Sequence, residues 1–132
     1  MNLFLEYQKR ISKILKKLEK KKLIQIPSKL YLTVELPPRN QKADISCNAA
    51  MILAKLNKSS PVKLAEILKK HLLINFKEFK SIEIAGPGFL NICFHISFWK
   101  KYLTKVIKLD SKFGSSRILK RKYNIEFVSA NP

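Results

Sequence analysis

Glycine, cysteine and acidic residues are all scarce in this chain of 132 residues, and each scarcity excludes a class of protein. With only three glycines, neither a GxGxxG pattern nor a glycine-rich phosphate loop occurs. The two cysteines, Cys47 and Cys93, are far apart and have no histidine or cysteine at metal-ligand spacing. We therefore predict reduced thiols in a cytoplasmic protein, and no metal site.

Long hydrophobic runs are missing as well. The apolar runs extend over a few residues, whereas a membrane-spanning helix needs about 20. The N-terminal segment carries Glu6 inside its apolar stretch and lacks the order of a signal peptide. We therefore expect no membrane insertion, and a single domain, because the chain is too short for two hydrophobic cores.

Positive charge is what the chain has in excess. Lysine and arginine number 27 against 9 acidic residues, which gives a formal net charge of +18 and a pI near 10.1. A surplus of this size points to nucleic acid or an anionic membrane surface. Lysine greatly outnumbers arginine, so the composition of a lysine-rich proteome is an alternative source. Charge favours nucleic acid but carries no sequence information.

Helical spacing of apolar residues predicts four helices. The first covers 3–22, and its lysine-rich side is either a solvated face or a ridge that meets phosphates. Asp44 is expected to cap a second helix that ends near residue 56. Ser60 followed by Pro61 is a strong start signal for the third. Ser97 is expected to cap the fourth, 98–109, whose apolar stripe we place in the core: Phe98, Trp99, Tyr102, Leu103, Val106 and Ile107.

Strands are predicted at 31–36, 81–85, 88–96 and 123–129. The resulting order, α-β-α-α-β-β-α-β, predicts an α+β domain in which a small antiparallel sheet packs with about four helices. Two of the three glycines flank Pro87, which indicates a tight turn or a close backbone approach between two strands.

The strand after this turn has two distinct faces. Leu90, Ile92, Phe94 and Ile96 form a core face, so period-two alternation places Phe89, Asn91, Cys93 and His95 together on the other. Alternate side chains stand about 7 Å apart, so Phe89 can stack on a base while Asn91 reads its edge. The equally weighted alternative is a second packed face covered by a helix. Cys93 and His95 have no partner nearby in sequence and are interpreted as bystanders.

Three segments resemble the N-terminal part of bacterial-type arginyl-tRNA synthetases, and the resemblance is collinear over nearly the whole chain. The first is 34–38 (VELPP), followed by 43–50 (ADISCNAA), 53–55 and 60–61. The second is 84–91 (IAGPGFLN), and the third and most specific is 126–132 (EFVSANP). In the family the third segment runs into the class I signature His-x-Gly-His, which binds ATP. The chain departs from the family at 42–44, where Lys-Ala-Asp replaces His-Gly-Asp.

The resemblance implies roles for particular residues. Phe89 and Asn91 match an aromatic and an amide side chain that contact a base of the tRNA D-loop. Glu126, Ser129 and Asn131 match residues that line the arginine pocket. Ala130, Asn131 and Pro132 match the start of the nucleotide-binding signature.

The resemblance also implies a parent enzyme, an arginine–tRNA ligase that uses ATP, L-arginine and its tRNA, acting as a cytoplasmic monomer. Residues 1–122 would form the tRNA D-loop-binding domain, and 123–132 the first strand and start of the catalytic domain. We expect this fragment to lack ligase activity. Two alternatives remain from the residues alone: a basic RNA-binding domain of ribosomal-protein type, and an interaction module whose helix 3–22 docks an acidic protein or membrane.

Overall fold

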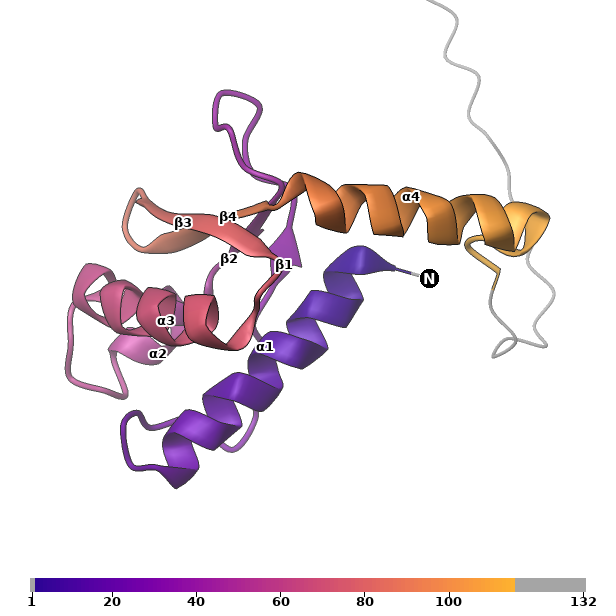
Figure 1. Ribbon diagram of the computed structural model, residues 1–132. Coiled ribbons are helices and arrows are strands. Elements are labelled where there is room, and N and C mark those ends of the chain that lie inside the picture. Colours follow the sequence, from indigo (N-terminus) through magenta and orange to yellow (C-terminus); the bar gives the residue numbers. More distant parts are fainter. Residues whose placement is uncertain (1, 116–132) are drawn as a thin grey trace, which may run out of the picture.

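The computed structural model describes residues 2–115, and the predicted strand at 123–129 and the residues Glu126, Ser129, Ala130, Asn131 and Pro132 lie outside this part (Figure 1). The described elements, in chain order, are α1 (Leu3–Lys20), β1 (Val34–Glu35), β2 (Ile45–Cys47), α2 (Ala49–Ala54), α3 (Pro61–Asn75), β3 (Phe79–Ala85), β4 (Phe89–Phe94), α4 (Ile96–Leu109) and the 3-10 helix η1 (Asp110–Lys112). The α+β class and the antiparallel sheet with four helices are confirmed.

The sheet has the strand order β1-β2-β4-β3, and every neighbouring pair is antiparallel. Its register places Glu35 opposite Ser46, Ser46 opposite Asn91, and Asn91 opposite Glu83. These four polar residues therefore form one row across the sheet. Because side chains alternate along each strand, the rows before and after it point to the opposite face.

The hydrophobic core lies on that opposite face, where α1, α2 and α3 cover the sheet (Figure 1). Leu90 and Ile92 of β4 are fully buried there. The apolar side of α1 is buried as predicted, and Ser60 caps α3 by accepting a hydrogen bond from the Lys63 N–H at 3.2 Å, with Pro61 as the first helical residue. The sequence signals for these two helices are confirmed.

Strand β2 corrects the prediction that Asp44 caps a helix. Ile45 and Cys47 are completely buried in a strand, and α2 begins only after Asn48. The Asp44 carboxylate instead accepts a hydrogen bond from the Phe94 N–H at 2.7 Å. Pairing with β4, which is distant in sequence, overrides the local helical spacing, because it satisfies the backbone groups of a buried segment.

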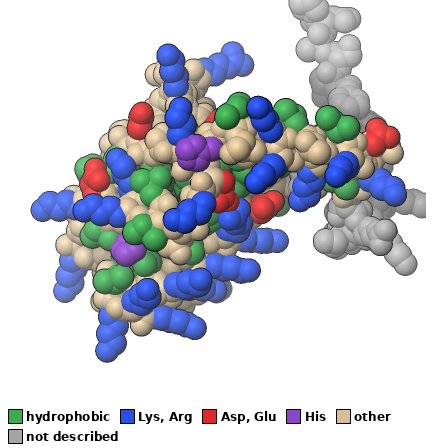
Figure 2. All heavy atoms as spheres, viewed as in Figure 1, with side chains coloured by type: hydrophobic (Ala, Val, Ile, Leu, Met, Phe, Trp, Pro, Cys, Tyr) green, Lys and Arg blue, Asp and Glu red, His purple; other side chains and the backbone are tan. Residues whose placement is uncertain are grey.

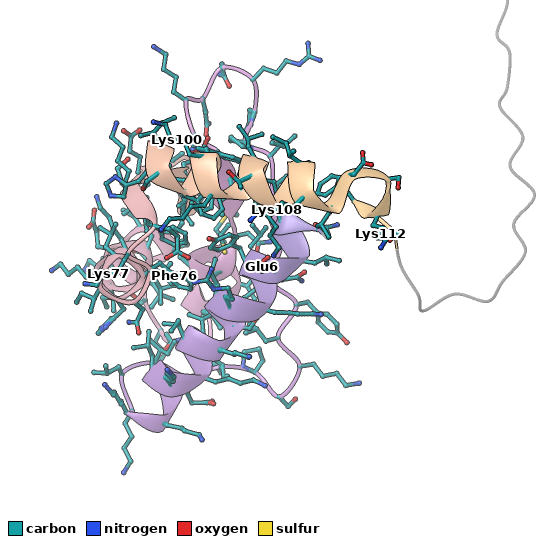
Figure 3. All side chains as sticks on the ribbon, turned by 45° about the vertical axis from the view of Figure 1, so that its right-hand side comes forward. Glu6, Phe76, Lys77, Lys100, Lys108 and Lys112 are labelled. Atoms are coloured by element: carbon teal, nitrogen blue, oxygen red, sulfur yellow. The ribbon has the colours of Figure 1, made fainter. Side chains whose placement is uncertain are left out.

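Helix α4 corrects a second prediction. It begins at Ile96 after His95, not after Ser97, and none of its residues is fully buried. It runs away from the sheet past the start of α1 and carries Lys100 and Lys108, and Lys112 lies on η1 beyond its end (Figure 3). Only its first turn contacts the core: Phe98 stacks on Phe94 with ring centroids 4.2 Å apart.

The prediction that the outer part of the α4 stripe lies in the core is wrong. Leu103 is 57% exposed and Ile107 is 76% exposed. Ile96, which the alternation placed on the core face of the strand, is 71% exposed because the strand ends at Phe94. The apolar spacing is correct for a helix, but within residues 2–115 no other element covers Leu103 and Ile107.

Candidate nucleic-acid interface

The second face of β4 carries Phe89, Asn91 and Cys93, as alternation predicts. Phe89 is half-buried and pairs with Ala85 across the β3–β4 hairpin. Asn91 lies in the polar row and is only 5% exposed. His95 does not join this face, because it follows the strand as the residue that precedes α4. The ring and the amide that were predicted to cooperate are therefore on the same side of the sheet.

A loop, rather than a helix, covers this face. We call residues 36–44, which connect β1 to β2, the cover loop. The Asn91 side chain donates a hydrogen bond from Nδ2 to Oε1 of Gln41, and the Cys93 thiol donates to the Lys42 carbonyl at 3.3 Å. The Oδ1 atom of Asn91 is buried and has no hydrogen-bond partner among the described residues. The arrangement lies between the two alternatives left by the sequence: Asn91 is covered, whereas Phe89 stays partly open.

A cavity of about 420 Å³ lies between the cover loop and the β3–β4 turn. A volume of this size suits a planar heterocycle. Its walls are mainly apolar, and of the residues that line it within the described part of the chain none is a lysine or arginine: Glu35, Leu36, Pro37, Pro38, Gln41, Ser46, Ala85, Gly86, Pro87 and Phe89. In a chain of charge +18, this lining is suited to an uncharged ring rather than to a phosphate.

The rim of this cavity depends on a close backbone approach. Gly88 adopts a φ of +132°, and a Cβ at this position would lie 2.8 Å from Cβ of Pro61. Glycine therefore lets the β3–β4 turn rest on the first residue of α3. Gly86 also has a positive φ, +51°, but a Cβ there would meet nothing within 4 Å. The sequence signal for a close approach is thus explained by Gly88.

Two cationic side chains lie on the cover loop but do not line the cavity. Arg39 and Lys42 are exposed on the cover loop, and lysines and arginines cover much of the visible surface (Figure 2). A separate groove of about 440 Å³ along α1 has a different lining: Gln8, Lys9, Ser12, Lys13 and Lys16. The exposed lysine ridge of α1 therefore has a hollow lined with ammonium and polar groups, which is suited to phosphate.

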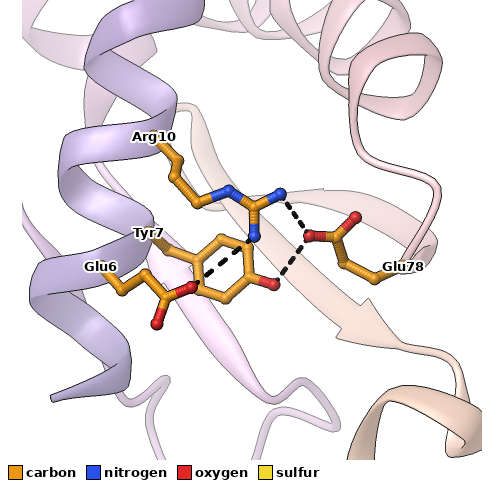
Figure 4. Close-up of polar contacts among 4 residues, drawn as sticks. All are labelled: Glu6, Tyr7, Arg10 and Glu78. Atoms are coloured by element: carbon orange, nitrogen blue, oxygen red, sulfur yellow. Dashed lines mark hydrogen bonds and ion pairs between the residues drawn. The ribbon is translucent and has the colours of Figure 1, made fainter. Parts of the chain in front are cut away.

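A cluster of titratable groups lies on the core side of the molecule (Figure 4). Oε1 of Glu78 accepts a hydrogen bond from the Tyr7 hydroxyl at 2.9 Å and an ion-paired contact from Arg10 at 2.6 Å. Arg10 also lies 3.9 Å from Glu6, and its guanidinium lies 4.8 Å from the ring centroids of Tyr7 and Phe76. Tyr7 is completely buried, and the cluster connects α1 to the segment before β3.

The surroundings shift the pKa values of this cluster. Burial, followed by the hydrogen bond to Glu78, raises the pKa of Tyr7. Partial burial would raise the pKa of Glu78, but hydrogen bonds from its own backbone N–H and from Tyr7, together with Arg10, lower it overall. Outside this cluster, burial raises the pKa of the Cys47 thiol in β2 to about 12, which keeps the thiol protonated and inert. The sequence did not indicate this cluster, because Tyr7 and Glu78 are 71 residues apart.

Metal-binding groups and membrane-spanning helices are both missing from the described part of the chain. Among residues 2–115, no three histidine, cysteine or acidic side chains are grouped as a metal site would require. The helices within the same residues are too short or too polar to cross a membrane.

Residues 5–94 match the family described as Arginyl tRNA synthetase N terminal domain. Three curated relatives, each named arginine–tRNA ligase, align with the whole chain. That of Pelagibacter ubique strain HTCC1062 is 39% identical over 134 residues, that of the Wolbachia of Brugia malayi strain TRS is 42% identical over 134 residues, and that of Sinorhizobium medicae strain WSM419 is 34% identical over 135 residues. The chain spans 23% of the length of each of these relatives.

Proposed function

Because this chain belongs to the family of arginyl-tRNA synthetase N-terminal domains, we propose that it is the tRNA-contacting part of an arginine–tRNA ligase and that it binds a base of the tRNA D-loop. The cavity beside Phe89 is the proposed site. The observation that carries this proposal is the contrast between a mostly apolar cavity, whose lining includes no lysine or arginine, and the +18 net charge of the chain.

An unstacked base would enter the cavity and lie on the Phe89 ring. Aromatic stacking of this kind contributes about 1–3 kcal/mol per base and does not depend strongly on base identity. Discrimination then requires polar groups with fixed positions, and the amide of Asn91, held in the polar row of the sheet, belongs to the set that provides them. Arg39 and Lys42 directly follow the lining residues Pro38 and Gln41 in the cover loop. They would contact the phosphates on either side of the base.

The lysine ridge of α1 is the proposed second contact. Lys9, Lys13 and Lys16 line a groove and are exposed. Contacts of this type position the RNA without reading its sequence, and their strength falls steeply with salt. The two sites divide the work, because the cavity accepts a base and the ridge accepts the backbone.

The remaining roles concern the longer enzyme. We propose residues 1–122 as the D-loop-binding domain of a cytoplasmic, monomeric ligase, with 123–132 as the start of its catalytic domain. In that enzyme Glu126, Ser129 and Asn131 would bind L-arginine, a substrate whose two cationic groups suit a carboxylate and neutral acceptors. Ala130, Asn131 and Pro132 would begin the site for ATP. The 132-residue chain alone should give no arginine-dependent pyrophosphate exchange, and turnover from it would contradict this assignment.

The decisive experiment is to replace Phe89 by alanine and measure the Kd of the chain for the arginine tRNA by filter binding at low salt. Loss of one stacked base predicts a Kd raised about 5- to 150-fold. Tyr31→Ala is the matched control, because Tyr31 is 74% exposed and does not line the cavity. Equal affinities for the Phe89→Ala variant and the unchanged chain would show that the cavity does not bind the base.

The same substitution in the complete ligase separates recognition from chemistry. Phe89→Ala and Asn91→Ala should slow tRNA charging while leaving the affinity for free arginine largely unchanged, because the arginine pocket is assigned to 126–131. Normal charging by the Phe89→Ala enzyme would rule out the D-loop assignment.

A further inference from the structure

We propose that Gln41 is the specificity-determining side chain that touches the base edge, and that buried Asn91 is a positioning residue that holds the Gln41 amide. This inference rests on the proposed base-binding role of the cavity. Nothing in the sequence pattern singled out Gln41, because it lies in a polar loop 50 residues from its partner.

The first observation is access. Asn91 is 5% exposed and is not among the residues that line the cavity, whereas Gln41 lines it together with Phe89. A ligand stacked on Phe89 would therefore meet the Gln41 amide before that of Asn91. A side chain that does not reach the cavity surface acts on the ligand only through a neighbour.

The second observation is the polarity of the contact between the two amides. Asn91 donates from Nδ2 to Oε1 of Gln41, so the oxygen of Gln41 faces Asn91. The Nε2 group of Gln41 has no hydrogen-bond partner among the described residues. In a planar amide the two groups lie on different branches, so fixing the oxygen leaves the NH₂ free to donate. The pair therefore offers the cavity a donor, which suits a ring nitrogen or carbonyl oxygen of a base.

The third observation is that the loop holds Gln41 in place. Its backbone N–H donates to the Pro38 carbonyl at 2.9 Å, and its carbonyl accepts from the Ala43 N–H at 3.1 Å. Hydrogen bonds join the following residues to β4. The Lys42 carbonyl accepts from the Cys93 thiol, and the Asp44 carboxylate accepts from the Phe94 N–H. A donor held by several bonds before the ligand arrives loses little conformational entropy on binding.

The rival arrangement gives the opposite prediction. If Gln41 only accepted the hydrogen bond of Asn91 in the free protein and moved aside for the base, removing its side chain would expose Asn91 and tighten binding. If Gln41 reads the base, removing it weakens binding and abolishes selectivity.

The experiment measures the Kd of the chain for the arginine tRNA and for transcripts in which each D-loop base is changed in turn. For the unchanged chain, one position should show a Kd ratio of about tenfold or more. Gln41→Ala should raise the Kd for the arginine tRNA about tenfold and bring that ratio close to one. Asn91→Ala made in the Gln41→Ala background should add little, because the positioning residue then has nothing to hold.

Gln41→Glu is the matched variant, because it keeps the length of the side chain and an oxygen that accepts from Asn91 but replaces the free NH₂ with an acceptor. It should lose the Kd ratio as fully as Gln41→Ala while unfolding at the same urea concentration as the unchanged chain. A retained ratio in both variants, or tighter binding by Gln41→Ala, would overturn the inference.

Phe89→Ala distinguishes this failure from failure of the proposed function. Weaker binding by Phe89→Ala combined with a retained ratio in the Gln41 variants would overturn only the role of Gln41. A normal Kd for Phe89→Ala, or equal binding of every transcript by the unchanged chain, would overturn both proposals.

Discussion

The two faces of β4 have different surroundings, although their residues alternate along a single strand of six residues. Leu90 and Ile92 are fully buried under the helices, in a core that continues through α1 and α3. Phe89 and Cys93 are only partly buried, and the cover loop is joined to this face by hydrogen bonds to Asn91 and Cys93. Helices close one face completely, whereas the loop leaves a cavity. Substitutions on the first face should therefore change stability, and those on the second should change binding.

The largest effect is expected from Ile92→Ala on the core face. Truncating a fully buried isoleucine costs about 2–5 kcal/mol, because transfer and cavity terms add. Urea unfolding should show this loss, while Cys93→Ala, one residue along on the other face, should stay within about 1 kcal/mol. Similar losses for the two variants would show that both faces are equally packed, and the comparison would fail.

Gly88→Ala tests the place where the cavity face rests on the helical layer. The backbone strain of its φ and the 2.8 Å approach to Pro61 predict a loss of about 1–3 kcal/mol. The variant should also bind tRNA more weakly, because the rim of the cavity has to move. Gly86→Ala is the control for stability, because it has strain but no clash, and it should cost about 1 kcal/mol. Equal stability losses would remove the role given to the Pro61 contact.

Glu78→Gln tests whether the core side contributes a pH-dependent part of the folding stability. Folding lowers the pKa of Glu78, so its ionised form contributes stability above the unfolded value of about 4.3, and this contribution is lost as the pH falls through the folded value. The substitution should cost about 1 kcal/mol at neutral pH and reduce the loss of stability on acidification below pH ~4. Unfolding curves measured across this range provide the test, and an unchanged acid dependence would contradict it.

Tyr7, on the same core side, gives a corresponding prediction for stability at alkaline pH. Folding raises its pKa, so its contribution is complete below the unfolded value of about 10 and is lost as the pH rises above it. Tyr7→Phe should remove this alkaline sensitivity, which unfolding curves measured at rising pH would reveal.

The smallest effect on stability is expected from the surface. Replacing Lys13, Lys16 and Lys17 of α1 by glutamine should leave the unfolding free energy within about 0.5 kcal/mol. It should reduce the slope of log K against log salt for tRNA by about one for each phosphate that the ridge no longer neutralises. The same replacement of Lys100, Lys101 and Lys105 in α4 removes equal charge elsewhere, and an identical change in slope would mean that net charge alone acts.

Local patterns predicted what depends on neighbours in sequence. The alternation of β4, the apolar side of α1 and the start of α3 at Pro61 are all found in the structure. Strand β2 was missed because its stability comes from pairing with β4, and the paired residues are far apart in the sequence, as for Cys47 with Leu90 and Ile45 with Ile92. A helical pattern in the sequence does not contain that partner.

The site was predictable only in part for the same reason. Phe89 and Asn91 could be placed on one face from spacing alone, but the burial of Asn91 depends on a loop that folds back over the strand. Helix α4 shows the complementary limit. Its spacing indicates an apolar side, but spacing does not indicate what covers that side.

The bare side of α4 gives the chain the behaviour of a cationic amphiphile. Ile107 and Leu103 are exposed beside lysines such as Lys108 and Lys105. At low ionic strength, repulsion between like charges should keep copies of the chain apart, but RNA bound as proposed above would also be retained under these conditions. High concentrations of a salting-out salt such as ammonium sulfate should release the RNA and at the same time drive α4 toward hydrophobic resins or other copies. One property of the helix thus sets the range of buffers in which the chain can be handled free of RNA.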